Sequence, residues 1–333
     1  MTTLSTQLLQ SFENRVTISG LASKSDVELK SFKNRKDGSE YRAYTGRVSI
    51  RTSENEVHTV QVFTREFKAD GTENKLFKSM ETLFDKLVTL EDVAQWEGSE
   101  EEAPQATKLF CFANLDLNEY FREGQLNSAL QPRAITLSSA KADKYEPHAS
   151  FDLDAIVIKV TDEFKLGEET GRKILHVMHP TYNGSLPFEL VVEEGEGAEY
   201  VEENFEVGST VNVYGDIINF SKKIEDGGSS KGGWGVAKAK PKWENRRELL
   251  LSGGTVMDEE NPKTLEIEQI KHLQALRNQH LASLEERSQG GGEQEAPKKK
   301  AGFSSEKKSP VDKKEALTGA PAKKPKADLG SLF

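Results

Sequence analysis

The stretch RAYTGRVSIRTSENEVHTVQVFTR, residues 42–65, carries the clearest information about the fold of this chain, because apolar and polar residues alternate along both of its halves. A period of two places successive side chains on opposite faces, which is typical of a β-strand. Strands are therefore predicted at residues 42–51 and 56–65, with Ser53-Glu54-Asn55 as the turn between them.

The same alternation predicts which side chains of these two strands face the interior. The residues predicted to point inward are Tyr44, Val48, Ile50, Val60 and Val62. The outward positions then include three cations and a large aromatic residue, namely Arg47, Arg51, Arg65 and Phe63. A purely structural strand does not require an exposed aromatic ring beside arginine. We therefore predict that the ring of Phe63 is a binding surface; the alternative is a ring covered by a loop or by the C-terminal helix.

Strands and helices on both sides of this stretch follow one order, which occurs twice. The first set comprises strands at 15–21, 42–51, 56–65, 108–113 and 134–139, with a helix at 74–90. The second set comprises strands at 151–161, 172–179, 186–192, 210–220 and 246–251, with a short helix at 198–205. A closed five-stranded barrel with a helix between its third and fourth strands is the oligonucleotide-binding (OB) fold. We expect a mainly β protein with short helices and two tandem OB barrels, in domains at 14–142 and 148–255.

Three further segments flank the barrels. Residues 1–13 are an N-terminal extension, and Asn261-Pro262 is predicted to open a helix that runs to residue 287. The apolar residues of that helix are Leu265, Ile267, Ile270, Leu273, Leu276 and Leu284. This stripe packs on a barrel or pairs with a second copy of the chain, and packing is the expected role. Residues 288–333 are rich in Gly, Pro and Lys and are predicted to be disordered.

The composition favours a binding protein over an enzyme. The single cysteine, Cys111, excludes an internal disulfide and a cysteine-based zinc site, and its apolar neighbours indicate a core residue. His176 and His179 lie three apart in a predicted strand and so on opposite faces, which is a poor geometry for one metal ion. No nucleophile, phosphate-loop or dinucleotide motif occurs. We expect no catalytic site, metal or cofactor, and without a signal peptide or membrane span we expect a cytoplasmic protein.

Charge is distributed unevenly in a chain with a formal net charge of −10. Residues 24–51 carry a net charge of +4, residues 221–247 carry +5, and residues 288–333 carry +4. Residues 189–206 contain eight Glu and no Lys or Arg. Such polarity indicates one face for an anionic polymer and another that repels it, whereas solvated surface is the alternative.

Two of these basic segments also contain aromatic residues, which is the combination that single-stranded nucleic acids require for phosphate and base contacts. Between strands one and two of the first barrel, the candidate residues are Phe32, Lys33, Arg35, Lys36 and Tyr41. Between strands four and five of the second barrel, they are Phe220, Lys222, Lys223, Trp234, Lys240 and Trp243. Tyr214 points outward in the fourth strand and is a further stacking candidate. Loops at these two places flank the binding face of an OB fold.

Three short stretches resemble bacterial and phage single-stranded DNA-binding proteins. NRVTISGL at 14–21 resembles their opening strand, VHTVQVF at 57–63 resembles their third strand (usually WHRVVLF), and GSTVNVYG at 208–215 resembles their fourth. The resemblance implies that Phe63 stacks on a base, while Val57 stands where the family often has a stacking Trp. Members commonly have one barrel and form tetramers, so two barrels imply a monomer or a homodimer.

The last six residues, DLGSLF, place large apolar side chains behind one carboxylate. Capture of a C-terminal carboxylate is a recognised binding mode, so we predict a partner-binding tip made of Asp328, Leu329, Leu332 and Phe333. It resembles the acidic tip with which the family recruits replication and repair enzymes, although the segment before it is basic here. An inert, frayed end is the alternative.

The sequence thus predicts a protein that binds single-stranded DNA with little sequence specificity. The expected processes are replication, recombination or repair, in a phage. The alternatives are an RNA-binding protein on the same fold and a phage structural or assembly protein whose barrels bind protein.

Overall fold

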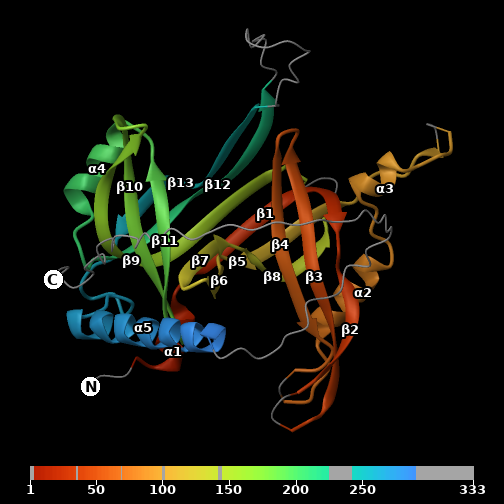
Figure 1. Cartoon of the computed structure of the whole chain (residues 1–333), viewed down its shortest axis with the longest axis horizontal. Helices are drawn as coiled ribbons and strands as arrows, with labels where there is room; N and C mark the ends of the chain where they lie inside the picture. Colours follow the sequence, from red (N-terminus) through yellow and green to blue (C-terminus); the bar gives the residue numbers. More distant parts are fainter. Residues whose placement is uncertain are drawn as a thin grey trace, which may run out of the picture. The chain divides into compact units, whose positions relative to one another are not determined.

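The first predicted barrel is present and closed in the computed structural model, which describes residues 4–34, 37–68, 70–99, 102–141, 145–224 and 242–289 (Figure 1). Its strands are β1 (Asn14–Ser25), β3 (Glu40–Ser53), β4 (Glu56–Arg65), β5 (Lys108–Asn114) and β8 (Arg133–Ser139). The ring runs β1-β5-β8-β4-β3 and closes through the pairing of β3 with β1. Only β4 and β8 are parallel, and the Gln61 N–H donates to the Pro132 carbonyl at 2.8 Å there.

Burial along β3 and β4 confirms the predicted alternation. The five residues predicted to point inward, Tyr44, Val48, Ile50, Val60 and Val62, are all at most 8% exposed. Cys111 is buried in the same core, and burial raises the pKa of its thiol to about 12.

The second barrel is also closed and has the predicted order of elements. Its strands are β9 (His148–Lys165), β10 (Glu168–Thr181), β11 (Gly184–Val192), β12 (Thr210–Ile224) and β13 (Lys242–Val256). The short helix α4 (Glu196–Asn204) lies between β11 and β12 in the sequence. β9 pairs with both β10 and β12, and β13 joins β11 to β12. Two tandem OB barrels in a mainly β chain are therefore confirmed.

Hydrogen-bonded strands join the two barrels directly. β1 pairs with β9 in an antiparallel register from Asn14↔Leu153 to Ser19↔His148, so one eleven-stranded sheet runs through both barrels. A second junction pairs Phe220 of β12 with Glu56 of β4. The barrels consequently belong to one compact unit. The predicted boundary between them is residues 143–147, of which 143 and 144 lie outside the described residues.

The helix predicted at 74–90 is two helices, α2 (Lys75–Phe84) and α3 (Leu90–Ala94). The break is explained by Thr89, which forms a capping box with Asp92 and so starts a new helix. α2 buries Phe77 and Met80 over the first barrel, whereas Leu76 is exposed.

Helix α5 (Ile267–Gln289) packs on the second barrel, but its predicted start at Asn261-Pro262 is wrong. Asn261 forms a turn instead, because its side chain accepts a hydrogen bond from the Lys263 N–H at 3.0 Å. The Leu265 N–H then donates to Thr210 Oγ1 at 3.2 Å. The segment around helix α1 (Thr6–Ser11) and the segment of α5 share a hydrophobic cluster with strands β9 and β10 of the second barrel. Its buried residues are Leu4, Phe12, Ile156, Met178, Leu265, Ile270 and Leu273. None of the helices in the described ranges combines the length and apolarity needed to cross a bilayer.

Two hairpins were not predicted. β2 (Glu28–Lys33) pairs with the start of β3, so part of the segment expected as a loop between the strands at 15–21 and 42–51 is a two-stranded arm. β6 (Leu117–Arg122) and β7 (Gln125–Leu130) form a separate hairpin before β8. Its two turn residues, Glu123 and Gly124, both have positive φ, as a tight hairpin turn requires. The predicted disordered tail at 288–333 lies outside the described residues from residue 290 onward.

Candidate nucleic-acid interface

The β2–β3 arm brings three predicted aromatic residues together on the outside of the first barrel. In the strand register Phe32 lies opposite Tyr41, and Phe63 of β4 lies opposite Thr45, so all three side chains share one face. The rings of Phe32 and Tyr41 stack with centroids 5.5 Å apart, and the Phe63 ring meets Phe32 edge-on at 6.0 Å. Phe63 is 41% exposed, so the ring can accept a partner from solvent.

Arg65 completes this group. Its guanidinium carbon lies 4.2 Å from the centroid of the Tyr41 ring and 5.9 Å from that of Phe63. Among the described residues no carboxylate forms an ion pair with it, so its charge is available to an anion. We call Phe32, Tyr41, Phe63 and Arg65 the aromatic cluster. An exposed ring for a base and a cation for a phosphate are the two contacts that single-strand binding needs.

The other cations predicted on the first barrel have different surroundings. Arg47 is held by Asp26, with 3.1 Å between Nη2 and Oδ2. Arg51 lies opposite Val57 on the outer face of β3 and β4. Lys33 lies on the far face of the arm, 3.6 Å from Glu40. Arg35 and Lys36 lie outside the described residues.

The basic segment predicted in the second barrel is a long hairpin of β12 and β13. Phe220 and Lys222 pair with Arg246 and Glu244, while Lys223 pairs with Trp243. Opposite residues of an antiparallel pair share a face, so Lys223 and Trp243 project from one side and Phe220 and Lys222 from the other. Trp243 is 54% exposed. Trp234 and Lys240 lie outside the described residues.

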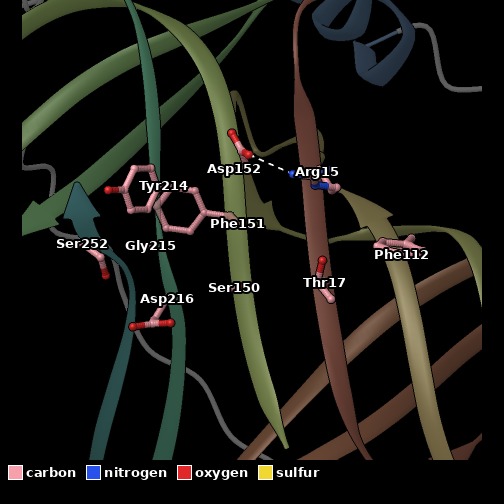
Figure 2. A pocket seen from close by; sticks show the side chains of 10 residues that line it. All are labelled: Arg15, Thr17, Phe112, Ser150, Phe151, Asp152, Tyr214, Gly215, Asp216 and Ser252. Atoms are coloured by element: carbon pink, nitrogen blue, oxygen red, sulfur yellow. Dashed lines mark hydrogen bonds and ion pairs between the residues drawn. The ribbon is translucent and has the colours of Figure 1, made fainter. Parts of the chain in front are cut away.

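Tyr214 lies apart from the aromatic cluster, in a hollow of about 450 Å³ that crosses β12, β9, β1 and β5. Figure 2 shows Tyr214 and Asp216 at one side of this hollow and Phe112 at the other. Between them the Arg15 guanidinium is paired with Asp152 at 3.0 Å. Tyr214 is 50% exposed, which suits stacking, but the carboxylates of Asp152 and Asp216 would repel a phosphate. The stacking role of Tyr214 therefore stays a prediction.

The two histidines weighed as metal ligands each have a partner of their own. His176 Nε2 lies 3.1 Å from Thr161 Oγ1, and His179 Nδ1 lies 2.8 Å from the Asp154 carbonyl oxygen. In the part of the chain that the structure describes, no three His, Cys, Asp or Glu side chains gather as metal ligands would.

Three residues near the interface were not among the site residues chosen from the sequence. Lys30 shares the face of the aromatic cluster, because it lies opposite Ala43, which in turn lies opposite Arg65. Arg247 projects beside Asn219 at the base of the β12–β13 hairpin. His58 is buried near the start of β4. Alternation could place His58 inside, but the faces of Lys30 and Arg247 depend on strand registers that their polar segments do not reveal.

Burial of His58 predicts a pH-dependent stability. Desolvation lowers the pKa of its imidazole from 6.5 to about 4, so the folded protein binds fewer protons than the unfolded chain. The free energy of unfolding is therefore highest above pH 6.5, where His58 is neutral in both states. It falls by about 3 kcal/mol as the pH drops towards 4, because only the unfolded chain takes up the proton. A His58→Asn variant cannot take up this proton. Urea unfolding across this pH range should show that the wild type loses more stability on acidification than the variant does. A difference in unfolding free energy that does not change with pH would contradict the assignment.

Comparisons with solved structures find single-strand binding proteins at low similarity. The wild-type single-stranded DNA-binding protein of Thermus aquaticus has 11% identity and a TM-score of 0.41, with 74% of this chain and 94% of that chain covered. A deletion mutant of the same protein has 11% identity, a TM-score of 0.40 and coverage of 75% and 96%. A replication protein A heterotrimer bound to single-stranded DNA has 8% identity, a TM-score of 0.18 and coverage of 82% and 72%. No curated protein matches the chain in sequence.

One family model matches the chain over most of its length. The YorF model aligns with residues 13–287, which include every strand of both barrels and nearly all of α5. Because the match extends across both barrels and the junction between them, the chain belongs to the YorF family.

Proposed function

We propose that this protein binds single-stranded DNA without catalysing a reaction, and that the aromatic cluster on the first barrel is the main contact. The observation that carries the proposal is the exposed ring of Phe63 between Phe32 and the unpaired cation of Arg65. Every base has a π-face, so stacking of this kind tolerates any sequence. The pairing of β3 with β2 and β4, backed by the packing of Tyr44 on Phe77 of α2, holds the rings in place without the ligand.

A titration of polythymidylate tests the proposal, with tryptophan fluorescence as the signal and several salt concentrations. Binding should weaken linearly on a log–log plot of affinity against salt, because phosphate contacts release counterions. A matched RNA oligonucleotide should bind more weakly. Tighter binding of the RNA would favour an RNA-binding protein. Absence of salt-dependent binding to either would contradict the proposal and favour barrels that bind protein.

The basic residues at positions 33, 35 and 36 supply a second prediction. Neutralising Lys33, Arg35 and Lys36 together should lower the affinity for all sequences, because these cations are proposed to contact phosphates. On a single strand each lost contact should reduce the log–log salt slope by about 0.7. The matched control is Lys86→Ala, which removes an exposed lysine after α2. An unchanged slope in the triple variant would show that these residues do not touch DNA.

We extend the proposal to a role in DNA replication, recombination or repair. A phage-encoded monomer or homodimer in the bacterial cytoplasm is the setting that the sequence resemblance implies. Size-exclusion chromatography with light scattering would separate the monomer and dimer from the tetramer common in that resemblance.

We also propose that the C-terminal tip recruits a replication or repair protein, although Asp328, Leu329, Leu332 and Phe333 lie outside the described residues. Deleting residues 329–333 should leave the affinity for single strands nearly unchanged, because the aromatic cluster is untouched. The same deletion should abolish capture of replication proteins in a pull-down. Capture of the same partners by the truncated chain would show that the tip is inert.

A further inference from the structure

A cleft of about 600 Å³ lies between the two barrels, next to the point where β4 pairs with β12. Its first wall comes from β4 and β7, including His58 and Leu130. Its second wall comes from β11, β12 and β13, including Pro187, Asn219 and Arg247. We call this the inter-barrel cleft. The cleft exists only because the two barrels are joined, and no single OB barrel would form it.

Two polar groups of the cleft lack partners among the described residues. The side chain of His58 is 3% exposed, and its Nε2 atom makes no hydrogen bond there. Arg247 is exposed and forms no ion pair with any described carboxylate. A buried polar atom without a partner is costly and rare in folded proteins, so His58 Nε2 calls for an explanation, and a ligand in the cleft would supply the missing bond.

The charges around the cleft leave Arg247 as the site for an anion. Glu248 is already bonded to Arg172 Nη2 at 2.7 Å. Glu189, on the second wall, keeps its negative charge, because burial lowers the pKa of the His176 imidazole 3.4 Å away. Arg247 is the one cation among the described residues that line the cleft. Between these polar groups the walls are apolar and include Leu130 and Pro187. An apolar slot with a cation at one side and an unpaired imidazole nitrogen at the other matches a nucleotide, which has a flat base and a charged phosphate.

Strand β4 leads from the cleft to the aromatic cluster, and β13 leads from the cleft into the β12–β13 hairpin. Thr59 lines the cleft and points to the same side of β4 as Phe63, four residues further on, which is about 13 Å along a strand. On the other side, Arg247 shares its face of the hairpin with Trp243. Exposed groups therefore lie on both sides of the cleft, Phe63 on the first barrel and Trp243 on the second.

We propose that the inter-barrel cleft holds one nucleotide of a strand that runs from the aromatic cluster to Trp243, with the phosphate on Arg247 and the base edge on His58. The proposal rests on the proposed function and extends it. A neutral imidazole can donate or accept a hydrogen bond at Nε2, depending on the tautomer, so His58 suits the edge of any base. The cleft thus makes the two barrels one binding site.

Thymidine oligonucleotides of two lengths test this path. One length of about 5 nucleotides fits within the site of one barrel, and one of about 20 extends beyond it, given about 4–16 nucleotides per OB fold. Arg247→Ala should weaken binding of the long oligonucleotide by about tenfold and reduce its salt slope by about 0.7, as expected for one lost phosphate contact. Binding of the short oligonucleotide, which occupies the aromatic cluster, should not change.

The controls separate the cleft from the cluster and from general charge. Arg247→Lys should keep most of the affinity, and Lys271→Ala, which removes an exposed cation of α5, should have no effect. In a Trp96→Phe, Trp234→Phe background Trp243 is the only tryptophan, and only the long oligonucleotide should quench it. If Phe63→Ala weakens binding while Arg247→Ala changes neither length, the cleft proposal is overturned and the proposed function stands. If wild type binds no oligonucleotide, both fail.

Discussion

Replacing Phe63 with alanine should weaken binding of a thymidine oligonucleotide by about 1–3 kcal/mol, or roughly 5- to 150-fold, if its ring stacks on one base. The ring is 41% exposed, and its neighbours in the cluster, Phe32 and Tyr41, stack on each other without it. The fold should therefore survive the change. Affinity is measured by fluorescence titration and the free energy of unfolding by urea denaturation, on the same preparations.

Phe164→Ala is the matched control for Phe63→Ala. Phe164 of β9 is also an exposed phenylalanine, but it lines neither the hollow at Tyr214 nor the inter-barrel cleft. Its loss should leave the affinity for DNA unchanged. Equal losses in the two variants would mean that exposed rings in general, and not the aromatic cluster, account for binding. Unfolding of the Phe63 variant without a separate loss of affinity would make Phe63 a core residue.

The largest effect on stability is expected from Arg277→Ala. Arg277 of α5 bonds to Glu119 of β6, with 2.6 Å between Nη1 and Oε2, and the two side chains are only 11% and 5% exposed. Removing one partner of a buried ion pair leaves the other charge buried and unpaired, which costs about 3–5 kcal/mol. The free energy of unfolding should fall by that amount in urea denaturation.

A surface ion pair provides the comparison for this prediction. Lys78 and Glu73 lie 2.6 Å apart, but their side chains are 66% and 67% exposed. Lys78→Ala should have no measurable effect, because water screens the pair. A double variant, Arg277→Met with Glu119→Leu, should recover much of the lost stability, since no buried charge remains. If Arg277→Ala were as mild as Lys78→Ala, α5 would not be held to the first barrel through this pair.

The alternation of residues was enough to predict the strands and their faces in the hairpin of β3 and β4. Val60 and Val62 are buried and Phe63 is exposed, as the period of two predicted, because a strand places neighbouring side chains on opposite faces whatever surrounds it. The order of elements was predictable for the same local reason. Helix boundaries were harder to predict from the sequence. Thr89 divides one predicted helix through its capping bonds, and Asn261 forms a turn where a helix start was expected.

Contacts between segments distant in sequence could not be predicted in this way. Phe32 meets Phe63 because β2 adds to the edge of β3 in one particular register, and β2 is so polar that alternation does not reveal that register. The pairing of β1 with β9, and with it the inter-barrel cleft, depends on two strand edges that match only when both barrels have formed. Local alternation therefore determines which side chains are exposed, whereas strand register and the joining of the barrels determine which exposed side chains meet.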